Sequence, residues 1–343
     1  MALFLGILIF TFVITSILIV PFIDLLYKIK FQRRDQKTRD FQGTRSVIFD
    51  KFHSIKAGTP VGGGFLIIVV VAVLYALFFP LISYLGVYIT AFYPIKAELN
   101  ILFFTFISFG LLGLYDDIMK FFGLTSKGIF GLRLRYKFLL QWILAFFIAI
   151  MLYQNLKIDF VNIPFWGILR LDIFYIPVAA FIIVAFTNAL NITDGLDGLA
   201  SGLLLIALLA FWILAGANLD TVLSVFLSFW IGALIAFLYF NVYPARIFLG
   251  DVGALSFGAT LAVVGLLLGK IIAIVVIAGF LVFEIGSSSI QMLSKCFLGR
   301  KAFKVAPFHL WLQERGWQEP KIVMRAWLAG IMLAIIGLWL AVI

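Results

Sequence analysis

Apolar residues fill most of this chain in runs of about twenty, and nearly all charged residues lie in the short segments between them. An α-helix needs roughly 20 apolar residues to cross the hydrocarbon core of a bilayer. The runs that reach or approach this length are Leu3–Leu26, Gly62–Leu85, Leu99–Leu114, Phe138–Tyr153, Ile173–Leu190, Leu199–Leu214, Thr221–Phe240, Ala254–Gly269, Ile271–Met292 and Val323–Ile343. The pattern predicts an all-α polytopic membrane protein with about ten transmembrane helices.

Two parts of this pattern allow a second interpretation. Only Lys270 separates the eighth run from the ninth, so one long bent helix is an alternative there. The first run has the length of a signal peptide, but no basic residue precedes it and no small-residue cleavage site follows it. We therefore expect an uncleaved first helix.

The composition supports a membrane protein. The 343 residues are 64% hydrophobic and 12% charged, whereas a soluble domain has about 25% charged residues. A water-soluble core could not hide so many apolar side chains, and no polar stretch is long enough for a separate domain. We predict a single integral membrane domain over residues 1–343.

The basic residues predict the orientation of the helices. With ten spans, all of the 26 Lys and Arg residues except Lys96, Lys157, Arg170 and Lys270 fall on one side. Positive loops stay in the cytoplasm, which places both termini outside. The net charge of +10 then indicates topology and contact with anionic lipid headgroups, and it does not indicate a nucleic-acid partner.

The segment between the fourth and fifth runs, residues 157–172, alternates loosely between polar and apolar residues around a Pro/Gly centre. This pattern predicts a short external hairpin lying on the membrane. An irregular loop is an equally good interpretation of the same residues.

Five aspartates lie where predicted helices meet short loops on the cytoplasmic side: Asp116, Asp117, Asp194, Asp197 and Asp251. An aspartate at mid-bilayer costs roughly 3 kcal/mol, so such groups are rare without a function. Their Gly-containing and polar surroundings favour a shared pocket over simple helix ends. Clustered carboxylates are ligands suited to Mg²⁺ and bound phosphates, and without a His or Cys cluster zinc is not expected.

Spacing refines this prediction. Asp116 and Asp117 are adjacent and would point about 100° apart on a helix, whereas Asp194 and Asp197 would share one face if helical. The lysines that could bind phosphate are Lys56, Lys120, Lys127 and Lys137, the last three in one predicted loop. The alternative is that these lysines only reflect the positive-inside bias. Glu284, within the ninth run, would pair with Gln291 or with a bound group.

Several stretches together resemble the phospho-N-acetylmuramoyl-pentapeptide transferase family, part of the polyprenyl-phosphate N-acetylhexosamine-1-phosphate transferases. They are Lys56-Ala-Gly-Thr-Pro60, Asp116-Asp-Ile-Met-Lys120, Asn188-Ala-Leu-Asn-Ile-Thr-Asp-Gly-Leu-Asp-Gly-Leu-Ala200, Asn241-Val-Tyr-Pro-Ala-Arg-Ile-Phe-Leu-Gly-Asp-Val-Gly253, Ala306-Pro-Phe-His309 and Gly316-Trp-Gln-Glu-Pro-Lys-Ile-Val-Met-Arg325. Their order and spacing extend along nearly the whole chain.

The resemblance implies a Mg²⁺-dependent transfer of phospho-N-acetylmuramoyl-pentapeptide from UDP to undecaprenyl phosphate, giving lipid I and UMP. The expected location is the bacterial cytoplasmic membrane, with the active site on its cytoplasmic face. Formation of a homodimer is left open, because the sequence does not give the oligomeric state.

The resemblance also implies roles for individual residues. Asp251 would bind Mg²⁺, Asp116 would deprotonate or orient the lipid phosphate, and Asp117 would support the site electrostatically. His309 would belong to the catalytic group on the sugar-peptide side. The positions that match substrate-binding residues are Lys56, Lys120 and Lys137 for phosphates or carboxylates, and Asn188, Asp194, Asp197, Asn241 and Phe248 for uridine diphosphate, with Phe248 stacking on uracil.

One departure from the family pattern affects the expected donor. The family usually has three consecutive histidines where this chain has His309-Leu310-Trp311. A sister enzyme that uses another UDP-N-acetylhexosamine is therefore the nearest alternative, and His309 as a structural interfacial residue is another. A secondary transporter is a remote alternative, because the acidic inserts lie at one membrane face and no matched repeat is evident.

Overall fold

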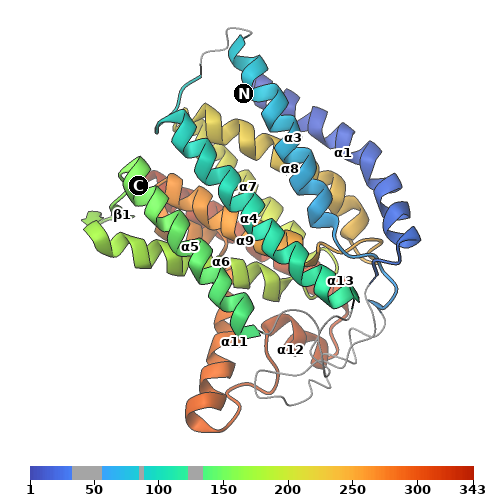
Figure 1. The fold of residues 1–343 in the computed structure, drawn as a ribbon. Coiled ribbons are helices and arrows are strands. Elements are labelled where there is room, and N and C mark those ends of the chain that lie inside the picture. Colours follow the sequence, from blue (N-terminus) through green and yellow to red (C-terminus); the bar gives the residue numbers. More distant parts are fainter. Residues whose placement is uncertain (33–55, 85–88, 123–133) are drawn as a thin grey trace.

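The structure is a computed structural model that describes residues 1–32, 56–84, 89–122 and 134–343. Lys127 lies outside these described residues. Helices account for most of them (Figure 1). The elements are α1 (Ala2–Lys28), α3 (Gly63–Tyr84), α4 (Ile95–Phe122), α5 (Leu134–Leu156), β1 (Phe160–Ile163), β2 (Gly167–Arg170), the short 3₁₀ helix η2 (Asp172–Phe174), α6 (Tyr175–Thr193), α7 (Leu199–Ala217), α8 (Thr221–Asn241), α9 (Gly250–Leu267), α10 (Ile271–Ile277), α11 (Gly279–Leu298), α12 (Phe308–Glu314) and α13 (Glu319–Val342).

The predicted polytopic helical fold is confirmed. Nine helices in the described part of the chain are long and apolar enough to cross a bilayer, and the pair α10 and α11 makes up to ten if it counts as one span. The protein is therefore a multi-pass membrane protein.

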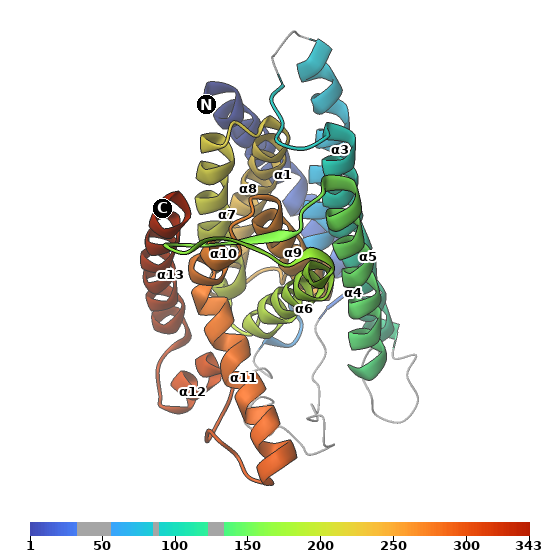
Figure 2. The ribbon, with the colours of Figure 1, turned by 90° about the vertical axis from the view of Figure 1, so that its left-hand side faces the viewer.

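The ninth predicted run is not one straight helix. Helix α9 ends before Gly269, whose φ of +65° is a conformation that favours glycine and stops a helix. The bend lies further on, at Ala278, where α11 leaves α10 at 83°. Figure 2 shows α11 extending beyond the bundle toward the end that carries α12.

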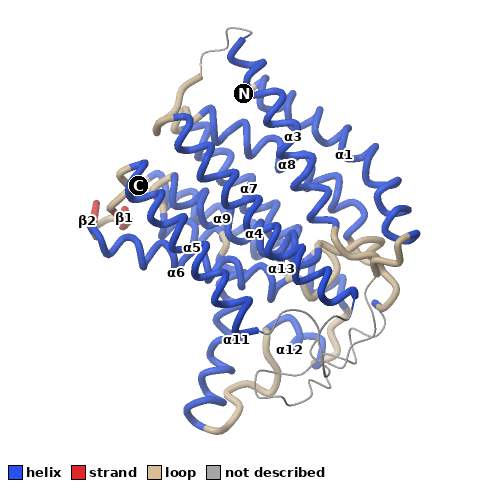
Figure 3. Tube along the Cα trace, in the orientation of Figure 1, coloured by secondary structure: helices blue, strands red, loops and turns tan. Residues whose placement is uncertain are grey.

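The hairpin predicted between the fourth and fifth helices is present, and the irregular-loop alternative is wrong. Strands β1 and β2 pair antiparallel, with Phe160 opposite Arg170 and Ile163 opposite Gly167. Figure 3 shows the two strands near the C-terminal end of α13. The ring of Phe165 at the hairpin turn lies 6.1 Å, centroid to centroid, from that of Trp339 on α13.

Helix α9 lies at the centre of the bundle and packs against α3, α4 and α6. Close backbone approach at glycines makes this packing tight. A Cβ at Gly64 on α3 would lie 2.2 Å from the Cα of Gly253, and one at Gly113 on α4 would lie 2.1 Å from the carbonyl oxygen of Asp251. The first turn of α9 is therefore held directly against the backbone of α3 and α4.

Candidate active site

The first cluster of charged side chains joins the last turns of α4 to the first turns of α5 and α9. Lys120 Nζ lies 2.9 Å from Asp116 Oδ2 and 2.7 Å from Asp251 Oδ2. Lys137 Nζ lies 3.0 Å from the same oxygen of Asp116 and also contacts Asp251 Oδ2. Each carboxylate thus contacts both ammonium groups, and this cluster is called the aspartate–lysine cluster below.

These groups sit inside helices, and the prediction that Lys120 and Lys137 belong to a loop is wrong. Helix α4 continues to Phe122, so Asp116 and Lys120 are one turn apart on the same face. Helix α5 begins before Lys137. Asp251 is in the first turn of α9, where a carboxylate is favoured by the helix dipole.

Asp117 points in another direction from Asp116, as the 100° spacing predicts. Its Oδ2 accepts the backbone N–H of Val252 at 3.0 Å, in the first turn of α9. Gly250, with a φ of +76°, leaves room for this carboxylate, since a Cβ there would lie 2.8 Å from Asp117 Oδ2. Asp117 therefore fixes the start of α9, and with it the position of Asp251.

The charges and oxygen atoms of the aspartate–lysine cluster fit a divalent cation. The cluster pairs two carboxylates with two lysines, and the neighbouring Asp117 adds a third carboxylate beside it. Asp116 Oδ2 and Asp251 Oδ2 converge on the space that the two Nζ atoms share. Among the described residues no group of three or more His, Cys, Asp or Glu side chains forms a metal site. The remaining ligands would have to be water or phosphate oxygens, as is usual for Mg²⁺.

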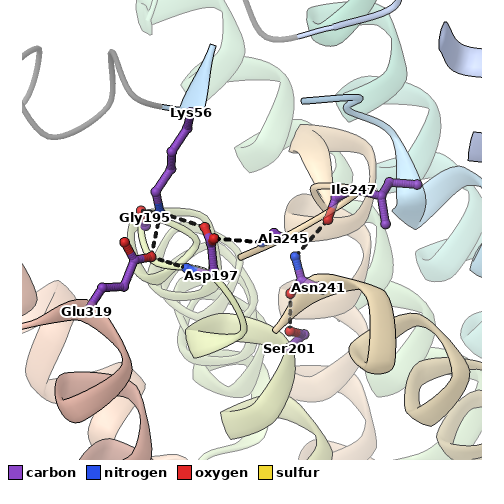
Figure 4. Close-up of polar contacts among 8 residues, drawn as sticks. All are labelled: Lys56, Gly195, Asp197, Ser201, Asn241, Ala245, Ile247 and Glu319. Carbon is purple, nitrogen blue, oxygen red and sulfur yellow. Dashed lines mark hydrogen bonds and ion pairs between the residues drawn. The ribbon is translucent and has the colours of Figure 1, made fainter. Parts of the chain in front are cut away.

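A second cluster surrounds the turn between α6 and α7 and is shown in Figure 4. Lys56 Nζ lies 2.6 Å from Asp197 Oδ1 and 2.5 Å from Glu319 Oε1, and it donates to the carbonyl of Gly195 at 3.3 Å. Glu319 Oε1 also accepts the backbone N–H of Asp197 at 2.6 Å. The other oxygen of Asp197 accepts from the N–H of Ala245 at 2.9 Å. This group is called the Lys56 cluster below.

The turn itself corrects one prediction. Helix α6 ends at Thr193 and α7 begins at Leu199, so Asp194 and Asp197 lie in a turn and not on one face of a helix. Asp194 caps the end of α6, with a half-buried side chain. Asp197 is 5% exposed and is the member of this pair that contacts Lys56.

The segment between α8 and α9 connects the two clusters. Asn241, at the end of α8, donates from Nδ2 to the carbonyl of Ile247 at 2.9 Å and accepts from the hydroxyl of Ser201 at 2.5 Å (Figure 4). The ring of Phe248 is 9% exposed and lies 5.9 Å from Lys56 Nζ. Asn241 thus holds a short segment that contacts Asp197 through Ala245 and leads directly to Asp251.

Two predicted site residues have contacts that differ from the expected ones. Asn188 donates from Nδ2 to Gln141 Oε1 on α5 and to its own helix at Val184, both at 2.8 Å. Its amide group therefore ties α6 to α5, one turn beyond Lys137. Glu284 does not pair with Gln291, because Gln291 instead bonds the backbone of Phe303.

His309, in the first turn of α12, is the partner of Glu284. Its backbone N–H donates to Glu284 Oε1 and its Nδ1 lies against Glu284 Oε2, both at 3.1 Å. Both side chains are buried, at 1% and 0% exposure. A Cβ at Gly195 would lie 2.5 Å from His309 Nε2, so the structure brings His309 against the same turn as Lys56.

Sequence reasoning missed Glu319 and misplaced the partner of Glu284. Glu319 lies in the Gly316–Arg325 stretch that carries part of the family resemblance, but only the fold reveals that it reaches Lys56. For Glu284, the available signal was an acidic residue inside an apolar run, and its partner is 25 positions away.

Comparison with known proteins adds an independent finding. Residues 99–269 match the family described as glycosyl transferase family 4. The phospho-N-acetylmuramoyl-pentapeptide-transferase of Aquifex aeolicus is 36% identical over 344 residues, covering 94% of this chain and 91% of the relative. The protein of the same name from Bacillus subtilis is 34% identical over 332 residues, covering 96% and 94%. The one from Rickettsia canadensis is 35% identical over 306 residues, covering 83% and 80%. With likeness at this level along nearly its whole length, the chain belongs to the phospho-N-acetylmuramoyl-pentapeptide-transferase family.

Proposed function

We propose that this chain transfers phospho-N-acetylmuramoyl-pentapeptide from UDP to undecaprenyl phosphate, with release of UMP and formation of lipid I. The observation that carries the proposal is the aspartate–lysine cluster, which combines ammonium groups suited to phosphate with carboxylates at one end of a membrane-spanning bundle. The names of the relatives supply the identity of the substrates.

The reaction joins two anionic groups, so charge neutralisation is its main physical requirement. An oxygen of the lipid phosphate forms a bond to the sugar-bearing phosphorus of the donor, and the bond from that phosphorus to the UMP oxygen breaks. Lys120 and Lys137 can each exchange a carboxylate contact for a phosphate contact, which lowers the repulsion between the reacting groups. Asp116, beside both lysines, orients the lipid phosphate or accepts its proton.

Asp251, with Asp116 next to it, would hold Mg²⁺ in this cluster. When bound, the cation would neutralise the diphosphate and make UMP a better leaving group. Asp117 keeps the first turn of α9 in place, so that Asp251 stays beside Lys120 and Lys137.

The Lys56 cluster has a different charge balance. Lys56 is matched by two carboxylates, Asp197 and Glu319, so this cluster as a whole is negative. A group that can donate hydrogen bonds, such as the uridine part of the donor, suits it better than a second phosphate. The turn from Asp194 to Asp197 and the ring of Phe248 would then contact the nucleoside.

A sister activity with another UDP-N-acetylhexosamine remains the second candidate because of the residues after His309. Leu310 is 3% exposed, and Trp311 stacks on Phe308 with the Arg315 guanidinium 3.8 Å from its ring. Both positions serve packing here, so they offer the sugar-peptide side no titratable group.

The deciding experiment measures UMP release by the purified full chain in detergent with undecaprenyl phosphate and Mg²⁺. UDP-N-acetylmuramoyl-pentapeptide is compared with UDP-N-acetylglucosamine, and each is repeated with Asp251→Ala and with EDTA. We expect turnover of the muramoyl donor alone, reduced about a hundredfold or more in the variant and abolished by the chelator. Preference for the simple sugar would establish the sister activity, and release of UMP from neither donor would refute the proposal.

A further inference from the structure

Glu284 is buried where an ionisable group is costly, and among the described residues the hydrogen-bond contacts of its carboxylate are all to His309. It lies on α11, six residues after the bend from α10, and has 0% exposure. Both of its carboxylate oxygens contact His309, one at the backbone N–H and one at Nδ1. An unmatched buried carboxylate would be strongly destabilising, so this contact fixes the two side chains together.

Within the described part of the chain, neither of these two contacts engages the other ring nitrogen of His309, Nε2. An imidazole whose Nδ1 is held by a carboxylate carries its proton there, and this leaves Nε2 available to a second partner. The position of that nitrogen is defined by Gly195, because a Cβ added there would lie 2.5 Å from Nε2 and 3.2 Å from Cε1. The free edge of the ring thus faces the turn that carries Asp197.

Helix α13 also holds the turn between α6 and α7. Glu319 accepts the N–H of Asp197, and Trp327 on α13 donates from Nε1 to the carbonyl of Gly198 at 3.1 Å. The turn is therefore a fixed surface against which Nε2 is placed, and not a loose segment that the ring happens to touch.

We propose that Glu284 is a positioning residue for the donor site: it holds Nδ1 of His309 so that Nε2 faces the turn between α6 and α7 and contacts the bound UDP-sugar. The part of this inference that concerns the substrate rests on the proposed function. The part that concerns the proton on Nδ1 stands on the geometry alone.

A purely structural role is the competing explanation, since Glu284 Oε1 also satisfies a free N–H in the first turn of α12. Glu284→Gln separates the two roles. The amide oxygen of glutamine can still accept the N–H of His309, but its NH₂ group then faces Nδ1 and can only donate. The cap is retained, and the proton of the imidazole is forced from Nδ1 to Nε2.

The direct test is ¹⁵N NMR of the full chain labelled only at histidine. The sequence holds two histidines, so in a His53→Gln background the signals of His309 stand alone. We expect a protonated Nδ1 in this background and an unprotonated Nδ1 after Glu284→Gln is added. A wild-type Nδ1 without a proton, or the same assignment in both proteins, would overturn the proposal whatever the enzyme's activity.

The second test is kinetic and uses the UMP-release assay. Glu284→Gln should raise the KM for the UDP-sugar about tenfold and leave the KM for the lipid phosphate unchanged. Gly195→Ala should do the same, because its methyl group crowds Nε2 without touching Glu284, and its NMR spectrum should retain the protonated Nδ1. An equal rise in both KM values, or none in either variant, would overturn the role in donor binding.

The matched control is Glu314→Gln, on α12, the short helix that also carries His309. Glu314 pairs with Lys304, whose side chain is 76% exposed, and it does not contact His309. We expect this variant to match the wild type in both KM values and in the position of the imidazole proton. A rise in the donor KM with Glu314→Gln would mean that losing any carboxylate in or against α12 has the effect, which would contradict a specific role for Glu284.

Discussion

Lys137 lies between two carboxylates and its side chain is 13% exposed. Because little water reaches this side chain, water cannot compensate the two carboxylates if the ammonium group is removed. Removing one member of a buried ionic group leaves the others unmatched, and this costs about 3–5 kcal/mol. The double contact of Lys137 with Asp116 and Asp251 places it in this class.

We therefore expect Lys137→Met to lower the free energy of unfolding in detergent by about 3 kcal/mol. Lys304→Met is the control, because the Lys304 side chain is 76% exposed and its pair with Glu314 should contribute less than about 1 kcal/mol. Adding Asp116→Asn to Lys137→Met should recover part of the loss, since it removes a carboxylate left without its partner. Equal stabilities for the two methionine variants would contradict this account of the cluster.

Local spacing predicted some residue-scale features and not others. The adjacent pair Asp116 and Asp117 points two ways on a helix, and this follows from helical geometry alone. The partners of Glu284 and Glu319 do not follow from it, because each lies more than twenty positions away and on another element. Periodicity describes one helix at a time, and contacts between helices depend on how they pack.

At the scale of elements, the contact between α4 and α9 positions Asp251 through a glycine. Gly113→Ala would place a methyl group 2.1 Å from the Asp251 carbonyl oxygen, and backbone cannot move aside as a side chain can. We expect this variant to displace the first turn of α9 and to reduce UMP release by at least about tenfold, by analogy with small misplacements at other active sites.

Gly110→Ala is the matched control for Gly113→Ala, because Gly110 lies one turn earlier on the same helix. Its added Cβ would come too close to the terminal Cδ1 of Ile68, at 2.7 Å, and that flexible side chain can rotate away; the next atoms, on Ser256, lie at ordinary contact distances of 3.7 and 3.8 Å. The control should retain near wild-type UMP release. Similar losses in the two variants would show that α4 tolerates no added methyl group on this face, and would refute a specific effect on Asp251.

Away from the two clusters, α8 is capped by Asp220, and the pKa of this carboxyl group is raised. Asp220 caps α8 by accepting the N–H of Leu223 at 3.0 Å and is 3% exposed. Burial raises the pKa of this carboxyl above its ordinary value of 3.8. The folded protein therefore keeps this proton to higher pH than the unfolded chain does, and stability falls as pH rises above about 4.

Asp220→Asn should reduce this pH dependence, because asparagine caps a helix equally well and does not titrate. We expect the variant to gain stability relative to the wild type as the pH is raised from about 4 to 8. Thermal unfolding in detergent across this range measures the difference. Parallel curves for the two proteins would rule out a contribution from Asp220, leaving Glu98, Tyr93 and Lys270 nearby as the groups to examine.

Element boundaries were predictable where polarity changes and unpredictable where it does not. The Pro/Gly centre of residues 157–172 predicts a hairpin, and the hairpin is present. The interruption that the sequence pattern placed at Lys270 is present between α9 and α10, whereas the 83° bend at Ala278 lies inside a continuous apolar run and has no signal in the pattern. Likewise the polar ends of α4 and α5 continue as helix beyond their apolar residues, which is why Lys120 and Lys137 were assigned to a loop.

For the whole molecule, the orientation in the membrane depends on whether α10 and α11 together cross it once. Cys296, near the end of α11, is exposed, and Trp166 at the hairpin turn is 88% exposed. With α10 and α11 as one span, an odd number of crossings separates these two positions, and they lie on opposite sides.

Labelling with a membrane-impermeant maleimide checks this prediction. We expect Cys296 to react in inverted vesicles only, and a Trp166→Cys variant in a Cys296→Ser background to react in right-side-out vesicles only. Reaction of both cysteines from the same side would mean that the bent pair enters and leaves the membrane at one face. Reaction from opposite but exchanged sides would reverse the orientation inferred from the basic residues.

The Lys56 cluster has a consequence for how the protein is made. Lys56 and Glu319 are 263 positions apart, so their contact joins a segment near the start of the chain to the last helix. A nascent chain that has inserted every helix before α13 has Lys56 and the N–H of Asp197 without this acceptor. Completion of the Lys56 cluster therefore waits for the final insertion step, and a chain that has not yet inserted α13 has only part of this cluster.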